Sequence, residues 1–341
     1  MKETYKAIQV TRPGVLEMIE KDLPEPGPGE VLIKVEACGI CGADAGAIEG
    51  MEKGVEYPRV PGHEVVGTLY KTSDPLPAWL KPGQRVGVGR LGGHCNVCEQ
   101  CRLGHFNLCQ NQPVTGSSRD GGYAEYMLAR TTGLVAIPDD LSSVDAAPLL
   151  CAGIATFNAL KKSHAQAGDT VVILGMGGLG HLAVQYARKM GFCVVAVGRG
   201  DDIAEEVMAL GAHHYIDTHN QDAVETIKAL GGAKVILSTI TDSPAVSAYL
   251  PALVPQGRFM IVGVGKEPLT LMPGVMIGRE LTVSGAITGT AIELEKALKF
   301  SLLADVRAMI ETRPLAQAQQ AYEKMRSGQA KFRMVLTVEH S

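Results

Sequence analysis

Four cysteines of this 341-residue chain are spaced as metal ligands are. Cys95, Cys98, Cys101 and Cys109 form the pattern C-x2-C-x2-C-x7-C. Four thiolates in one short loop can enclose a tetrahedral zinc ion and leave no open position, which is typical of a structural site. An iron–sulfur cluster is the chemical alternative, because ferredoxin spacing also begins C-x2-C-x2-C. The long gap before the fourth cysteine and the lack of a second cluster motif favour zinc.

Further candidate ligands are dispersed along the chain. Cys38 and Cys41 form a C-x-x-C pair in "CGICGAD", His63 and Glu64 lie in "PGHEVVG", and Cys151 lies in "PLLCAG". A catalytic zinc needs three protein ligands and one open position. Taken singly, a histidine is more often a hydrogen-bonded turn residue and a cysteine a small core residue. The pattern alone leaves open whether the C-x-x-C pair is a redox dithiol, half of a metal site, or one ligand beside a bystander.

A glycine-rich motif indicates a nucleotide site. "VVILGMGGLGHLAVQ" contains G-x-G-x-x-G between an apolar strand and a helix. Gly175 allows the tight turn, Gly177 lets a pyrophosphate approach the backbone, and Gly180 lets the helix pack on the strand. The exposed N–H groups at the start of the helix then bind phosphate. We expect the cofactor to contact Gly175, Gly177, Gly178, Leu179 and Gly180.

The end of the next strand indicates which dinucleotide binds. An acidic residue about 20 positions after the motif would hydrogen-bond the ribose 2′-hydroxyl of NAD. This chain has Gly198 and Arg199 there instead, which leave room for a 2′-phosphate and neutralise it. Asp201 and Asp202 are the alternative acidic residues, but we expect them at a helix N-cap. The pattern therefore favours NADP over NAD.

The elements around these residues fall into two kinds. The first half has short β-rich runs separated by Pro and Gly turns, and a helical pattern begins near residue 142 with Ser142 or Ser143 as N-cap and Pro148 as an expected break. From residue 170 apolar strands alternate with helices, which implies a parallel sheet covered on both faces. The tail predicts two helices and a last strand, "FRMVLTV". The fold class is therefore α/β, in two domains.

Composition excludes several classes of function. The chain is 46% hydrophobic and 20% charged, with a formal charge of −4, so nothing suggests binding to nucleic acid or to an anionic membrane. We find no apolar stretch of the roughly 18 residues that span a bilayer. The start lacks a secretory signal, so we expect a cytoplasmic protein in which the eight cysteines do not form disulfides.

Together these motifs resemble the zinc-dependent medium-chain alcohol dehydrogenases. The likeness runs the whole length and includes "CGICGAD", "PGHEVVG", "GQRVGVG", the four-cysteine loop, "GGYAEYML", "PLLCAG" and "FRMVLTV" in the family's order. A cysteine in "PLLCAG" makes the cinnamyl-alcohol-type and bacterial NADP-dependent branch the most similar one. The resemblance implies a GroES-like catalytic domain over residues 1–152 and 289–341, and a Rossmann domain with a doubly wound parallel sheet over residues 153–288.

The resemblance also implies site residues. Cys41, His63 and Cys151 would be the ligands of a catalytic zinc, and Cys38 would have no ligand role. Glu64 would lie against the metal as a transient ligand, and Asp44 would orient His63 through its ring N–H. Further positions that match the family are Thr156 near the nicotinamide and Arg333 near the pyrophosphate. The four-cysteine loop would hold a second, structural zinc.

The implied reaction is hydride transfer between NADP(H) and a primary alcohol or aldehyde. One departure bears on it, because Ala43 and Gly46 stand where the family usually has a Ser or Thr and, in some members, a histidine that pass on the alcohol proton. Conjugate C=C or iminium reduction on the same scaffold is therefore an alternative, and a non-catalytic NADPH- or zinc-binding relative is another. We expect Leu91 and the segment 51–54 to line a pocket for medium or aromatic substrates. We also expect a homodimer or homotetramer, with "ELTVSGA" as the pairing edge.

Overall fold

The chain divides into two compact units, and one of them combines two separate stretches of sequence. Residues up to Ile154 and from Thr288 onward form the first unit, and Ala155–Ile287 form the second. This computed structural model describes residues 3–340. The catalytic role expected for the first unit stays a prediction.

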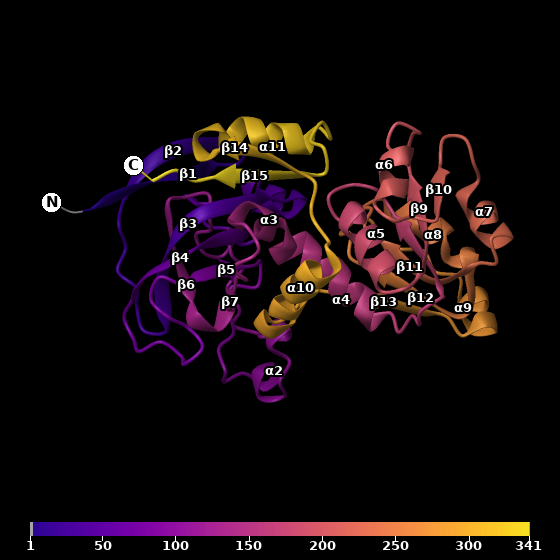
Figure 1. Cartoon of the computed structure of the whole chain (residues 1–341), viewed down its shortest axis with the longest axis horizontal. Coiled ribbons are helices and arrows are strands. Elements are labelled where there is room, and N and C mark those ends of the chain that lie inside the picture. The colour runs from indigo at the N-terminus through magenta and orange to yellow at the C-terminus, as the bar shows by residue number, and fades with distance from the viewer. Residues whose placement is uncertain (1–2, 341) are drawn as a thin grey trace. The chain divides into compact units, whose positions relative to one another are not determined.

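The first unit is built on a seven-stranded sheet. Its path runs β14-β15-β3-β4-β5-β7, with β6 also paired to β3, and β1 and β2 form a separate antiparallel pair (Figure 1). The central strand β3 is almost entirely buried because it pairs with β4, β6 and β15. The parallel pair of β14 and β15 brings the C-terminal segment into this unit; the sequence reading had missed β14. The strands are β1 (Thr4–Arg12), β2 (Val15–Asp22), β3 (Glu30–Ile40), β4 (Glu64–Thr72), β5 (Arg85–Val88), β6 (Tyr126–Arg130), β7 (Leu134–Ala136), β14 (Ile310–Pro314) and β15 (Arg333–Thr337).

The helices of this unit include one that does not break where the sequence suggests. Ser142 caps it as expected, by accepting a hydrogen bond from the Asp145 N–H, but after Pro148 the chain continues through a π-helical turn, Leu149–Gly153. By length and composition Ser143–Lys162 could cross a membrane, contrary to expectation, yet 83% of its apolar window is buried inside the fold, as in a core helix. The helices are α1 (Ala45–Ile48), α2 (Glu99–Arg102), α3 (Ser143–Pro148), α4 (Ile154–Lys162, continuing into the second unit), α10 (Ala291–Ala304) and α11 (Ala318–Arg326).

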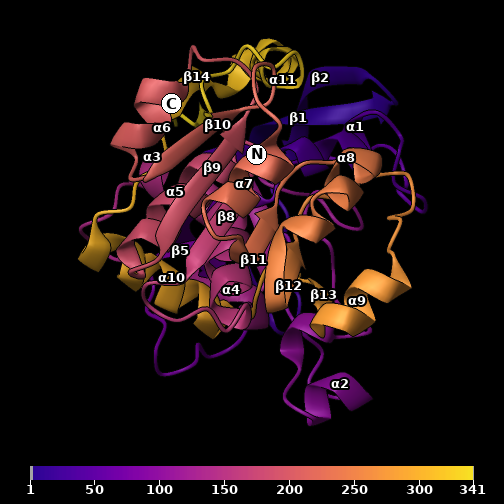
Figure 2. The same cartoon turned by 90° about the vertical axis from the view of Figure 1, so that its right-hand side faces the viewer.

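The second unit is a doubly wound parallel sheet, as predicted. Figure 2 shows its six strands in the order β10-β9-β8-β11-β12-β13. The order reverses between β8 and β11, and ligands of such sheets bind at the carboxyl ends of the strands at this switch point. Elements β10, α7 and α9 were not predicted from the sequence. Strand β10 is short and begins with polar residues. The elements are β8 (Thr170–Leu174), β9 (Cys193–Gly198), β10 (His214–Asp217), β11 (Ala233–Ser238), β12 (Leu253–Ile261), β13 (Thr282–Gly285), α5 (Gly180–Lys189), α6 (Ala204–Ala209), α7 (Ala223–Ala229), α8 (Ser243–Ala248) and α9 (Pro273–Arg279).

Candidate metal and cofactor sites

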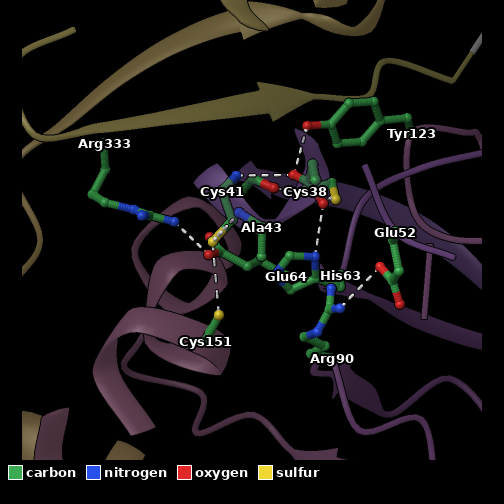
Figure 3. Close-up of polar contacts among 12 residues, drawn as sticks. Cys38, Cys41, Ala43, Glu52, His63, Glu64, Arg90, Tyr123, Cys151 and Arg333 are labelled. Carbon is green, nitrogen blue, oxygen red and sulfur yellow. Dashed lines mark hydrogen bonds and ion pairs between the residues drawn. The ribbon is translucent and has the colours of Figure 1, made fainter. Parts of the chain in front are cut away.

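Three elements of the first unit bring four potential ligands together. Cys41 follows β3, His63 immediately precedes β4, Glu64 is the first residue of β4, and Cys151 lies in the π-helical turn. One ligand atom from each lies within 4.8 Å of all the others, and all four residues are buried. The two sulfur atoms are 3.9 Å apart (Figure 3). Residues far apart in sequence thus converge on one point.

Asp44 holds the cluster in place from the short turn after β3. Its Oδ2 accepts a hydrogen bond from the Cys41 N–H at 2.9 Å, and its Oδ1 is 2.7 Å from Nδ1 of His63. The hydroxyl of Tyr123, a fully buried residue, also donates to Asp44 Oδ2, at 3.0 Å. Because Nδ1 faces Asp44, Nε2 is the nitrogen of His63 that is available to a metal. Sequence reasoning found Asp44 but not Tyr123.

The buried ligand groups share protons with one another and with Asp44. A hydrogen bond between the two thiols lowers the pKa of Cys41 and raises that of Cys151, so the pair shares one proton. Burial alone would lower the pKa of His63, but Asp44 and Cys41 together outweigh burial and raise the pKa to about 10. Burial raises the pKa of Glu64 to about 7, against the opposing charge of Arg333. A bound metal ion would displace these protons, as thiolate and neutral imidazole are the forms that ligate.

The donor set fits zinc. Tetrahedral geometry at a Zn–S distance of about 2.3 Å puts two sulfur ligands roughly 3.8 Å apart, and the two thiols are separated by 3.9 Å. Among the described residues, Nε2 of His63 and Oε2 of Glu64 are buried without a hydrogen-bond partner. An ion in this place would satisfy both atoms. Two thiols, one imidazole and an exchangeable carboxylate are the ligands expected of a catalytic zinc with an open position.

Cys38 stays outside this cluster. Its side chain is fully buried, and its Sγ is 3.6 Å from the Gly39 carbonyl, to which it donates. A Cβ on Gly62 or Gly122 would come within 2.8 or 3.1 Å of the sulfur, so the thiol fills a tightly packed space. Burial raises its pKa well above the ordinary value, which disfavours a reactive thiolate. The arrangement fits a packed bystander better than one half of a redox dithiol.

The four-cysteine loop forms the second group of ligands. Its four sulfur atoms also lie within 4.8 Å of one another, with Cys95–Cys101 and Cys98–Cys109 separations of 4.0 Å. The side-chain amide of Asn111 donates to Cys95 Sγ at 3.4 Å, and this bond is the main cause that lowers the pKa of Cys95 to about 6. Thiolates at these separations fit a closed tetrahedral zinc, as the sequence predicts.

The glycine motif lies between β8 and α5 in the second unit. Gly175 has a φ of +92°, and a Cβ there would lie 2.5 Å from Ile240 Cγ2. A Cβ on Gly180 would lie only 1.8 Å from the Gly175 carbonyl oxygen, which requires glycine for this tight turn. A Cβ on Gly177 would meet nothing within 4 Å, so no packing demands glycine there. The open backbone at Gly177 fits the close approach of a ligand, with Gly178 and Leu179 completing the turn.

The loop after β9 is held by β10, which the sequence reading overlooked. The Asp217 carboxylate accepts a hydrogen bond from the Gly200 N–H at 2.7 Å, and the Tyr215 hydroxyl donates to the Gly200 carbonyl at 2.6 Å. A Cβ on Gly198 would lie 2.4 Å from the Tyr215 hydroxyl oxygen, so the residue must stay small. Arg199 is exposed at this loop. Asp217 carries an acidic group near the loop, but it is engaged with backbone N–H groups.

One expectation about this loop is wrong. Asp201 and Asp202 do not cap the following helix, because α6 begins at Ala204 with Ile203 as its N-cap residue. The Asp201 carbonyl instead accepts a hydrogen bond from the Ala204 N–H, in the turn that precedes α6. Both aspartates are exposed.

Thr156 and Arg333, the two cofactor positions that the resemblance implies outside the glycine motif and its following loop, are both buried. Thr156 is fully buried in α4. Arg333, at the start of β15, is also buried, and its Nη2 forms an ion pair with Glu64 Oε1 (Figure 3). Its Nε is buried without a hydrogen-bond partner among the described residues. Contacts of either residue with a cofactor stay predictions.

Comparisons with known proteins agree with this architecture. The chain matches the alcohol dehydrogenase GroES-like domain over residues 27–139 and the zinc-binding dehydrogenase domain over residues 178–302. It is 38% identical to the alcohol dehydrogenase notN of Aspergillus sp. (strain MF297-2), over 99% of both chains. It is also 38% identical to an alcohol dehydrogenase of Geobacillus stearothermophilus, over 95% of this chain and 96% of that one. The crystal structure of AibC superimposes with a TM-score of 0.92 at 30% identity, covering 100% of this chain and 97% of that chain.

Proposed function

Because the chain belongs to the zinc-dependent medium-chain alcohol dehydrogenases, we propose that it interconverts primary alcohols and aldehydes with NADP(H) as cofactor. In the direction of reduction, an aldehyde, NADPH and a proton give an alcohol and NADP+. The buried group of Cys41, His63 and Cys151 is the observation that carries this proposal, because it retains a complete set of three ligands. A zinc ion bound there polarises a carbonyl or stabilises an alkoxide.

The side chains around this site would bind the metal and orient its ligands. Cys41, His63 and Cys151 would hold the metal, and Asp44 fixes the ring of His63 so that Nε2 points away from the carboxylate. Glu64 is kept near the three ligands by its ion pair with Arg333, which suits a carboxylate that exchanges with water on the metal. We further propose a second, closed zinc at Cys95, Cys98, Cys101 and Cys109, and therefore two zinc ions per chain.

The preference for NADP rests on the loop after β9. Gly198 must be small because of Tyr215, and the neighbouring Arg199 is exposed and able to neutralise a 2′-phosphate. The nearest buried carboxylate, that of Asp217, is occupied by the N–H groups of Gly200 and His219. It is therefore poorly placed to select the 2′-hydroxyl of NAD.

A conjugate C=C or iminium reductase is the second candidate, and Ala43 is the observation that favours it. Ala43 is half-buried beside the cluster, with its N–H donating to Cys41 Sγ at 3.5 Å, and its methyl group has no proton to pass on. Reduction at carbon does not require a proton at the carbonyl oxygen. Without a hydroxyl at position 43, carbonyl reduction would depend on water for proton delivery.

A panel of saturated aldehydes, enals and cyclic imines, assayed with NADPH and NADH in parallel, tests these proposals. Turnover of saturated aldehydes supports the first candidate, and activity confined to enals or imines supports the second. A protein that binds two zinc ions yet consumes cofactor with no substrate would be a non-catalytic relative. Faster turnover with NADH than with NADPH would contradict the assignment of Arg199.

We also propose a cytoplasmic homo-oligomer. The eight cysteines form no disulfide among the described residues, and six of them are candidate zinc ligands, which suits a reducing compartment. Strand β13 lies at the edge of the parallel sheet, where a second copy could pair with it. Light scattering on the purified protein would distinguish a dimer or tetramer from a monomer.

A further inference from the structure

A charged pair lies beside the candidate catalytic cluster. Nη2 of Arg90 donates a hydrogen bond to Oε2 of Glu52 at 3.1 Å (Figure 3), and the two side chains are 27% and 29% exposed. Charged side chains that are more than two-thirds buried usually have a partner of opposite charge. The pair is therefore a defined feature of the fold and remains reachable from solvent.

The backbone fixes Arg90 between two of the metal ligands. Val65 in β4 pairs with Val88 in β5, so the segment that leaves β5 toward Arg90 passes the segment that carries His63, and Figure 3 draws Arg90 next to His63. Gly89 packs against the residue before Cys151, since a Cβ on Gly89 would lie 2.7 Å from the Leu150 carbonyl oxygen. The segment that carries Arg90 thus runs past the residues next to two of the candidate ligands, His63 and Cys151.

Glu52 reaches the same place from the other side. Its N–H donates to the Gly46 carbonyl at 2.9 Å, and Gly46 lies two residues after Asp44. A Cβ on Gly46 would lie 2.8 Å from Glu52 Oε2, so the missing side chain of Gly46 makes room for this carboxylate. Gly46 therefore allows the pair to form next to the turn that holds Cys41.

Arg90 has N–H groups, and Glu52 has an oxygen atom, that can still hydrogen-bond to a ligand. Among the described residues, the guanidinium of Arg90 makes its one side-chain hydrogen bond through Nη2, and Glu52 accepts through Oε2. Nη1 and Nε of Arg90 and Oε1 of Glu52 stay available. An amide or hydroxyl group can accept from such a guanidinium and donate to such a carboxylate at once.

We propose that Arg90 and Glu52 recognise a neutral polar group on the substrate, an amide or a hydroxyl, and so favour aldehydes and alcohols that carry one. The inference rests on the proposed function. An apolar substituent would cover the charged pair without replacing its hydrogen bonds to water, which is unfavourable. A carboxylate would gain a bond to Arg90 but would be repelled by Glu52. The preferred substrate is thus polar and uncharged at this end, in contrast to the plain aromatic or medium-chain substrate suggested by the sequence.

Five matched aldehydes test this inference: benzaldehyde, and the meta and para isomers of formylbenzamide and of formylbenzoate. For wild-type protein we expect kcat/KM for one formylbenzamide isomer to exceed that for benzaldehyde and for the matching formylbenzoate by about tenfold or more, as a hydrogen bond to a charged group provides. Arg90→Leu should reduce the preference for the amide over benzaldehyde to near one. Glu52→Gln should raise kcat/KM for formylbenzoate relative to the amide by about tenfold, because the charge of Arg90 is then uncompensated.

Glu30→Gln is the matched control. Glu30 pairs with Arg119 at 3.0 Å and with similar exposure, and we expect this variant to keep the wild-type ratios. Wild-type preference for benzaldehyde, or ratios unchanged in Arg90→Leu and Glu52→Gln, would overturn the inference while leaving the proposed function intact. If Arg90→Leu does not fold, Glu52→Gln alone decides. If the wild type turns over saturated aldehydes but none of these aromatic ones, this inference alone is overturned; if it turns over no aldehyde at all, the proposed function is overturned and this inference with it.

Discussion

The hydroxyl of Tyr123 is hydrogen-bonded to Asp44 across 3.0 Å, 79 residues away along the chain. Asp44 in turn contacts Nδ1 of His63, so the tyrosine supports the ligand through the carboxylate. Such outer partners set the orientation and the tautomer of a ligating histidine. Tyr123 is thus a positioning residue of the candidate metal site.

Replacing Tyr123 by Phe should weaken zinc binding without unfolding the protein. The ring stays in its buried place, but Asp44 loses one of its donors and holds His63 less firmly. We expect the affinity of the catalytic site for zinc to fall by about 10- to 100-fold. Competition with a chromogenic chelator measures this affinity for each site separately. An unchanged affinity at the catalytic site would show that the Cys41 N–H is enough to hold Asp44.

The two cysteines of the C-x-x-C pair should differ sharply when each is replaced by Ala. Cys41→Ala removes a ligand, so the purified protein should carry one zinc per chain instead of two and should lose activity. Cys38→Ala should retain both zinc ions and cost about 1 kcal/mol of stability, because it leaves a small cavity in a packed region. Metal analysis and thermal unfolding of both variants, with the wild type alongside, provide the measurement. Loss of zinc from Cys38→Ala would contradict its assignment as a bystander.

Adding a hydroxyl at position 43 should reveal whether proton transfer limits carbonyl reduction. Ala43→Thr supplies a hydroxyl near the cluster, and Ala43→Val supplies the same shape without one. If proton transfer is limiting, kcat for a saturated aldehyde should rise with Thr by up to about 10²-fold, the lower end of the usual contribution of acid–base catalysis, and should not rise with Val. Equal rates for the two variants would show that the missing hydroxyl does not limit turnover.

Removing the charge of Arg199 should change the choice of cofactor. Arg199→Gln should lower kcat/KM for NADPH by about 10- to 100-fold, as loss of a charged hydrogen bond to phosphate does, and should leave that for NADH nearly unchanged. Lys228→Gln, which alters an exposed lysine of α7, is a suitable control. Gly198→Asp is a poor alternative, because any side chain at position 198 meets the hydroxyl of Tyr215. Equal loss with both cofactors would refute the role of Arg199 in selecting NADP.

The parallel sheet could be predicted from the sequence because it depends on local patterns, whereas Cys41, His63 and Cys151 lie far apart along the chain and were grouped through the family resemblance. Apolar strands, glycines and closely spaced cysteines can be recognised within a short stretch of sequence. The four-cysteine loop was predicted from its spacing alone. Tyr123 and the pair of Arg90 and Glu52 depend on strand register between distant segments, which a single sequence does not display. The short strand β10 was missed because its first residues are polar and partly exposed. The misplaced start of α6 shows that an aspartate before a helix need not cap it.

The π-helical turn that carries Cys151 restricts the length of the helix between Pro148 and Cys151. Successive residues of an α-helix are rotated by about 100° around its axis, so removing one residue between Pro148 and Cys151 would turn the sulfur away from Cys41. Deletion of Leu149 or Leu150 should therefore shorten the chain by one residue with little loss of helix, yet abolish metal binding. The widened turn therefore makes the spacing of this helix, and not only the identity of its cysteine, a condition for the site.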